Sequence, residues 1–153
     1  MEPVWLPYGQ LAPDFALQDA NGRDFSRQQF RGRSGLVLLF IPPAPDLPLL
    51  ADMARDSGEY IELNARVVLI VHTAPENLKQ AAKWGEFPFI VLADPDGIAW
   101  KAYTGLENPG YGVFILDTYG GVDEQQVSGS PDAFPGAEKI LEWTRGTQYR
   151  CSV

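Results

Sequence analysis

The sequence predicts an α/β fold in which helices cover both faces of a central mixed sheet. Strand-like apolar segments alternate with helix-like amphipathic segments between residues 35 and 105. This alternation is typical of parallel strands joined by crossover helices. A hairpin pattern precedes the alternating region, and a second hairpin and a closing helix follow it. Antiparallel strands are therefore expected at both sides of a parallel centre.

The N-terminal hairpin is predicted at residues 14–25. Short strand-like runs flank Asn21 and Gly22 there, and Asn-Gly is strongly preferred in two-residue hairpin turns. The first core strand is predicted at residues 35–41, where "GLVLLFI" is apolar on both faces. A strand buried on both sides has this composition.

A single helix is predicted over residues 46–63 from the near-helical spacing of its apolar residues. Asp46 is its expected N-cap, and Pro48 falls in the first turn, where proline is tolerated. A second buried strand is predicted at residues 66–72, "RVVLIVH". The same signals then predict a helix at 74–85, a strand at 87–94, a helix at 98–105, a hairpin of strands 111–117 and 122–129, and a closing helix at 134–146.

These elements divide the chain into an arm at residues 1–8, one domain at 9–146 and a tail at 147–153. The arm is apolar and aromatic, with Trp5 beside Leu6 and Tyr8. Such a segment is often a contact element in a dimer or with a partner, and the alternative is that it folds back on its own domain.

Composition excludes several classes of function. The net charge of −8 and scattered basic residues do not suit nucleic-acid binding, which needs concentrated Lys and Arg. The longest apolar run, at residues 35–41, is too short to span a membrane. The N-terminus shows no basic region followed by an apolar stretch, so a cytoplasmic location is expected.

One cysteine, Cys151, and one histidine, His72, are present. A single cysteine allows no intramolecular disulfide and no cysteine-based zinc site. The acidic residues show no EF-hand spacing. We therefore expect no metal and no cofactor.

Four stretches in this order resemble the peroxiredoxin branch of the thioredoxin fold, the alkyl hydroperoxide reductase and thiol-specific antioxidant family. They are "GQLAPDFALQDANGRDFSRQQFRGRSGLVLLFIP" at 9–42, "VVLIVHTAPENLKQAAKW" at 67–84, "FPFIVLADPDGIAWKAYTG" at 87–105 and "GVFILDTYGGV" at 112–122. The resemblance implies a thioredoxin-like three-layer sandwich with an N-terminal hairpin. It also implies a thiol peroxidase as the ancestral activity.

The active-site residues of that family do not carry over. In the family, a threonine follows the proline at the end of the first core strand by four residues, and the peroxidatic cysteine follows three later. Counting from Pro42 gives Asp46 and Leu49, and counting from the next proline gives Leu47 and Leu50. Neither register supplies a thiol.

The family's arginine lies three residues before the phenylalanine of the last hairpin, which is Tyr111 here, counted from Phe114. The resemblance therefore implies a degenerate peroxidase site at Pro42, Asp46, Leu49 and Tyr111. A leucine side chain has no lone pair with which to attack a peroxide oxygen.

Three functions remain open on the sequence. The first is a degenerate redoxin domain that acts by binding, as a homodimer or with a redox protein. The second is an antioxidant oxidoreductase that uses Cys151 or a partner's thiol. The third is an unrelated enzyme at the sheet edge, where Asp46, His72 and Asp94 could do acid–base work.

Overall fold

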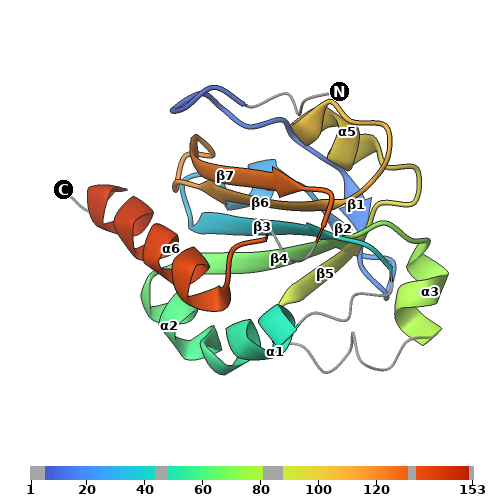
Figure 1. The fold of residues 1–153 in the computed structure, drawn as a ribbon, viewed down its shortest axis with the longest axis horizontal. Helices are drawn as coiled ribbons and strands as arrows, with labels where there is room; N and C mark the ends of the chain where they lie inside the picture. The colour runs from blue at the N-terminus through green and yellow to red at the C-terminus, as the bar shows by residue number, and fades with distance from the viewer. Residues whose placement is uncertain (1–5, 44–47, 81–87, 131–133, 152–153) are drawn as a thin grey trace.

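A seven-stranded mixed sheet lies between two layers of helices in the computed structural model of the chain (Figure 1). The structure describes residues 6–43, 48–80, 88–130 and 134–151. Its elements are β1 Leu17–Gln18, β2 Asp24–Phe25, the 3₁₀ helix η1 Arg27–Phe30, β3 Gly35–Ile41, α1 Pro48–Arg55, α2 Ser57–Glu62, β4 Ala65–Val71, α3 Pro75–Gln80, β5 Ile90–Ala93, α5 Ile98–Thr104, β6 Tyr111–Leu116, β7 Val122–Ser128 and α6 Ala137–Cys151. The predicted α/β class with a mixed central sheet is confirmed.

The strand order is β2-β1-β5-β4-β3-β6-β7. Strands β3, β4 and β5 are parallel to one another, whereas β6 pairs antiparallel with β3, and β7 with β6. The N-terminal hairpin joins the other side, where β1 pairs antiparallel with β5. The parallel strands therefore occupy the centre, and both sides of the sheet end in antiparallel pairs.

Strand β3 is buried along its whole length because apolar residues cover both of its faces. Side chains alternate across a strand, so Val37 and Leu39 contribute to one core cluster and Leu38 and Phe40 to the other. Helices α1, α2 and α6 cover the first face, and α5 packs on the second (Figure 1). The continuous apolar run in the sequence follows from this double burial.

The helix predicted over residues 46–63 is two helices in the structure. Asp56 separates α1 from α2 with φ −91° and ψ 8°, and its N–H donates to the carbonyl of Met53 at 3.0 Å. Ser57 and Gly58 follow, and both residue types stabilise a helix less than alanine does. The predicted N-cap, Asp46, lies outside the described residues.

The last helix is longer than predicted. Gly146 was expected to end it and residues 147–153 to form a tail, but α6 continues to Cys151. Thr147 and Gln148 are buried, and the Gln148 side-chain amide donates to the carbonyls of Leu63 and Asn64 at 2.9 and 3.0 Å. This contact across the domain supports the turns beyond Gly146.

The described end of the predicted arm contacts its own domain. The Leu6 N–H donates to Oε1 of Gln125 at 3.0 Å, and Nε2 of Gln125 donates to the Leu6 carbonyl at 2.6 Å. Leu6 also packs against the core cluster that contains Phe40. Trp5 lies outside the described residues, so a dimer contact through the arm stays a prediction.

One further predicted boundary differs from the structure, and another lies outside the described residues. Helix α3 is described only as far as Gln80, because residues 81–87, which include the rest of the predicted helix at 74–85, lie outside the description. The strand predicted at 87–94 is β5, Ile90–Ala93. Pro88 and Phe89 precede it without pairing in the sheet, and proline cannot donate a ladder hydrogen bond.

Two buried tyrosines provide a matched test of hydrogen bonding in the core. The Tyr103 hydroxyl donates to the Pro13 carbonyl at 2.5 Å, whereas the buried Tyr60 hydroxyl has no partner among the described residues. We expect Tyr103→Phe to lower the free energy of unfolding by about 1 kcal/mol, because it leaves the Pro13 carbonyl unpaired. Tyr60→Phe should be neutral or stabilising by up to about 1 kcal/mol. Urea unfolding measures both, and equal losses would contradict this assignment.

The same tyrosines predict an alkaline loss of stability. Burial raises the pKa of both hydroxyls well above the usual 10.0, and Asp56 and Glu59 add to the effect at Tyr60. Above about pH 10 the unfolded chain loses these protons while the folded chain keeps them, so the free energy of unfolding falls as pH rises. Urea unfolding across this range should show a shallower fall in the Tyr60→Phe/Tyr103→Phe variant. An unchanged slope would show that other groups cause the loss.

Candidate functional site

Most of the candidate site residues predicted from the sequence lie at the end of the sheet where the parallel strands terminate. Pro42 follows the end of β3, His72 follows the end of β4, and Tyr111 begins β6. The His72 backbone N–H donates to the carbonyl of Ile41 at 3.2 Å, which joins the ends of β3 and β4. Because β6 runs antiparallel to β3, its first residues return to this edge.

Leu49 is the second residue of α1 and is only 8% exposed. Its side chain belongs to the core cluster that covers one face of β3. Leu50, the alternative in the second register, is 4% exposed and lies in the same cluster. Either register therefore places a buried hydrocarbon side chain in the first turn of α1, where a thiolate would need solvent or polar contacts.

Tyr111 is half-buried at the start of β6. Its ring centroid lies 5.7 Å from that of Phe134, and both rings pack against the cluster that holds Leu49. A guanidinium at this position would have supplied positive charge and hydrogen-bond donors. The aromatic pair supplies apolar surface instead.

His72 and Asp94 lie together, but the carboxylate and the imidazole do not pair. The ring Nδ1 of His72 lies 3.1 Å from the backbone carbonyl of Asp94. Since a carbonyl oxygen only accepts, Nδ1 carries the proton and donates in this contact. The Asp94 carboxylate, 2% exposed as a residue, instead accepts from the backbone N–H groups of Ala99 at 3.3 Å and Trp100 at 3.0 Å.

The Asp94 carboxylate therefore caps the first turn of α5. Asp94 was predicted as a candidate acid–base group, and its role as a cap was not predicted. An aspartate a few residues before an apolar helical run is the signal that could have revealed it. The predicted sheet-edge site of Asp46, His72 and Asp94 stays a prediction, with Asp46 outside the description.

The space behind His72 is small. A hollow of about 10 Å³ lies at this edge, lined by Phe40, Ile41, Ile70, His72, Asp94, Trp100, Pro109 and Gly110. A volume of this size holds about one water molecule. It offers no room for an organic substrate beside the imidazole.

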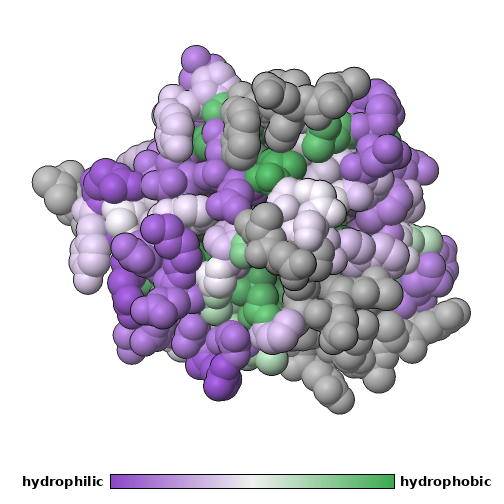
Figure 2. Space-filling view, viewed as in Figure 1, coloured by the Kyte–Doolittle hydropathy of each residue, from purple (hydrophilic) through white to green (hydrophobic). Residues whose placement is uncertain are grey.

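A larger groove of about 500 Å³ separates α1 from α6. It is lined by Asp52, Arg55, Asp56, Ala137, Glu138, Leu141 and Arg145. Arg55 pairs with Asp52, and Arg145 pairs with Glu59 at 3.0 Å. Figure 2 shows hydrophobic residues between α6 and α1, with hydrophilic residues on the helices to their left. The groove therefore has apolar lining residues, Ala137 and Leu141, surrounded by charged ones, and it lies beside α1, which contains Leu49.

The described residues offer little to the remaining candidates for a site. No group of three or more His, Cys, Asp or Glu residues there could hold a metal ion. None of the helices in the described ranges is long and apolar enough to cross a membrane. Cys151 is the last residue of α6, and only its backbone is described.

The cap on α5 predicts a difference between two neighbouring aspartates. Asp94→Ala should lower the free energy of unfolding by about 1–2 kcal/mol, because two buried N–H groups lose their acceptor. Asp96→Ala, at an exposed position of the same turn, should change it by less than about 0.5 kcal/mol. Chemical denaturation of both variants measures the difference. Equal effects would remove the assigned role of the Asp94 carboxylate.

Comparison with known proteins finds one family along most of the chain. Residues 8–125 match the AhpC/TSA family. The chain is 32% identical over 122 residues to the chloroplastic peroxiredoxin Q of Sedum lineare, a match that covers 73% of this chain and 64% of the relative. It is 31% identical over 123 residues to that of Populus jackii, covering 73% and 56%. The matches span between 55% and 66% of the curated relatives' own length.

Solved structures with the same fold share little sequence with the chain. Peroxidoxin BcpB from Mycobacterium tuberculosis superposes with a TM-score of 0.73 at 24% identity, covering 91% of this chain and 96% of that one. The reduced 2-Cys peroxiredoxin of Plasmodium vivax gives 0.82 at 17% identity, covering 95% and 83%. At these identities the likeness concerns the fold alone.

Proposed function

The chain belongs to the AhpC/TSA family, and from that premise we propose that it binds a protein partner and does not reduce peroxides with a thiol of its own at the end of β3. The relatives are named peroxiredoxins, and the fold matches theirs. The side chains at the corresponding edge have different chemistry, and function depends on the side chains of a site more than on the fold.

The buried position of Leu49 carries the proposal. A peroxidase of this family needs a thiolate that reaches the peroxide, attacks one oxygen and breaks the O–O bond. Leu49 is 8% exposed and packs in the core. Tyr111 packs with Phe134 in place of a cation. Where the family has a thiolate and a cation that stabilises it, Leu49 and Tyr111 would supply apolar surface that excludes water.

The surface beside this edge supports binding. The groove between α1 and α6 has a volume of about 500 Å³ and combines Leu141 and Ala137 with charged residues. Pro43 and Pro48 are exposed on either side of the undescribed stretch between β3 and α1. Apolar floors with polar rims are typical of protein-interaction surfaces. A second copy of the chain and a redox protein are the proposed partners, and the cytoplasm is the proposed location.

An oxidoreductase that uses Cys151 or a partner's thiol is the second candidate, favoured by the names of the relatives. The position of Cys151 argues against a reactive thiol of this chain. It ends α6, and the negative end of a helix dipole disfavours a thiolate. Arg150 precedes it but pairs with Asp123, so part of its charge is already neutralised.

Peroxide consumption separates the two candidates. With dithiothreitol as reductant, the wild-type chain should consume hydrogen peroxide no faster than the Cys151→Ser variant and no faster than the reductant alone, because no thiol occupies the edge of β3. Absorbance at the peroxide band, or a ferrous-oxidation assay, measures the rate.

Two results would overturn the proposal in different ways. Loss of peroxide turnover in Cys151→Ser would show that the chain is an oxidoreductase that uses its only thiol. Peroxide turnover that persists in this variant would indicate a catalytic site without a thiol, at the strand ends near His72. Sedimentation velocity of the intact chain then distinguishes a homodimer from a monomer that binds another protein.

A further inference from the structure

The arginines of the chain divide into two groups. Four of the eight form ion pairs: Arg23 with Asp19, Arg55 with Asp52, Arg145 with Glu59 and Arg150 with Asp123. The other four have no ion pair within the described ranges: Arg27, Arg31, Arg33 and Arg66. We call these four the arginine cluster, because the fold brings them to one end of the sheet.

Strand pairing brings the cluster together from two distant segments. Arg27, Arg31 and Arg33 precede β3, and Arg66 is the second residue of β4. Leu36 pairs with Arg66 in parallel register, and neighbouring strands lie about 5 Å apart. The Asn64 side chain also donates to the Arg33 carbonyl at 2.9 Å. The loop that carries Arg31 and Arg33 is thus fixed beside the start of β4.

The charges of the exposed arginines in the cluster are not neutralised by a carboxylate among the described residues. Arg31, Arg33 and Arg66 are exposed. The Arg66 guanidinium lies 5.9 Å from the centre of the Phe30 ring. A cation over an aromatic face is stabilised without using its N–H groups. The donors of Arg66 therefore remain available to an acceptor from outside.

Arg27 adds a positive charge beneath this surface. It is 4% exposed, and its Nε and Nη1 have no hydrogen-bond partner among the described residues. Nη1 packs against Gly120, where a Cβ atom would lie 2.7 Å from it. Arginine stays protonated in proteins, so a buried guanidinium without a partner raises the positive potential at this end of the sheet.

Two of the three nearby carboxylates, those of Asp14 and Asp117, accept backbone N–H groups. Oδ1 of Asp14 accepts from the N–H groups of Phe15, Arg27 and Gln28. Oδ1 of Asp117 accepts from the N–H groups of Tyr119 and Gly121. The same turn lies beside the cluster, because the Gly32 N–H donates to the Thr118 carbonyl. Glu62 ends α2 close to Asn64, and no ion pair joins it to an arginine of the cluster.

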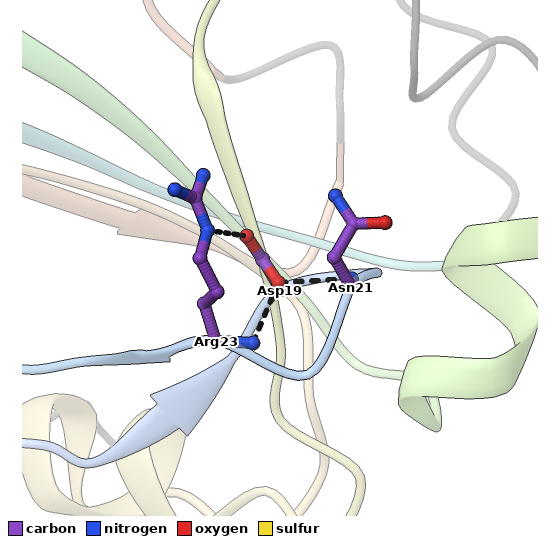
Figure 3. A network of polar contacts seen from close by, with 3 residues as sticks. All are labelled: Asp19, Asn21 and Arg23. Carbon is purple, nitrogen blue, oxygen red and sulfur yellow. Dashed lines mark hydrogen bonds and ion pairs between the residues drawn. The ribbon is translucent and has the colours of Figure 1, made fainter.

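The hairpin shows how the chain neutralises an arginine elsewhere. Figure 3 shows Asp19 between Asn21 and Arg23, with the Arg23 guanidinium on Oδ2 at 3.3 Å and two backbone N–H groups on Oδ1. Burial alone would raise the pKa of the Asp19 carboxyl, but these donors and the nearby positive charge hold it below its usual value. No carboxylate is placed in this way beside Arg31, Arg33 or Arg66.

We propose that the arginine cluster is a docking site for a carboxylate-rich segment of a partner protein. Guanidinium groups bind carboxylates through paired N–H donors. Three exposed guanidiniums on two neighbouring segments suit several separate carboxylates. A nucleic acid is disfavoured, since specific complexes neutralise more phosphates than this cluster can contact and the remaining surface is acidic. At physiological salt, charges more than about 8 Å away are largely screened, so the net charge of −8 does not prevent local docking.

The docking site is independent of the proposed function at the end of β3. Arg33 and Arg66 lie where β3 and β4 begin, and Pro42 lies where β3 ends. Seven residues of strand separate these ends by about 20 Å. In Figure 1, α2, which leads into β4, and α3, which follows it, lie at opposite ends of the sheet.

Binding of a fluorescent hexaglutamate peptide tests the proposal. We compare the wild-type chain with Arg31→Gln/Arg33→Gln/Arg66→Gln, using anisotropy at physiological ionic strength. The triple variant should bind about tenfold more weakly, since each lost exposed ion pair weakens binding by about twofold. Arg27 is left unchanged because it is buried. Circular dichroism of the triple variant should match that of the wild type, because all three substituted side chains are exposed.

The matched control is Arg23→Gln/Arg55→Gln/Arg145→Gln, which removes the same number of arginines, all with carboxylate partners. Its affinity for the peptide should equal that of the wild type. Equal weakening in both variants, or no binding by the wild type, would overturn the proposal. Displacement of the peptide by inorganic phosphate, added at a concentration that supplies the same amount of negative charge, would also overturn the proposal. The cluster would then bind a single oxyanion and not a segment with several carboxylates.

Discussion

The burial of β3 on both faces is the constraint on which the rest of the structure depends. Its residues pair with β4 on one side and β6 on the other, so its backbone hydrogen bonds are satisfied within the sheet. Its side chains then need apolar cover above and below. Helices α1 and α6 supply it on one face, and α5 on the other. A polar substitution within residues 35–41 would face one of two closed cores.

The same packing supports the proposal that the family fold is kept here without a thiol at the end of β3. Helix α1 covers β3 through Leu49, Leu50 and Met53. A hydrophobic residue at the start of that helix adds to the core, whereas a thiolate there would require polar surroundings. Tyr111 and Phe134 extend the apolar surface in the same direction. Stability and redox chemistry therefore favour different residues at this end of the sheet, and the burial of Leu49 serves stability.

Sequence patterns predicted the parts of the fold that depend on periodicity. The buried strands at 35–41 and 66–72 and the last hairpin match β3, β4, β6 and β7 closely. The break at Asp56 and the extension of α6 past Gly146 depend on contacts distant in the sequence, which no local pattern contains. The sequence predicted which residues lie at the candidate site but not what their side chains contact. The cap made by the Asp94 carboxylate and the lack of ion pairs in the arginine cluster both depend on how neighbouring segments pack.

The place of α6 in the chain has a consequence during synthesis. Ile140 and Leu141 close the face of the sheet formed by Val113 and Ile115, yet α6 is the last element in chain order. Until residues 137–151 have left the ribosome, this apolar face has no cover from them. The growing chain is then open to non-native association for that interval. The apolar face formed by Val113 and Ile115 is therefore closed only once α6, Ala137–Cys151, has docked on it.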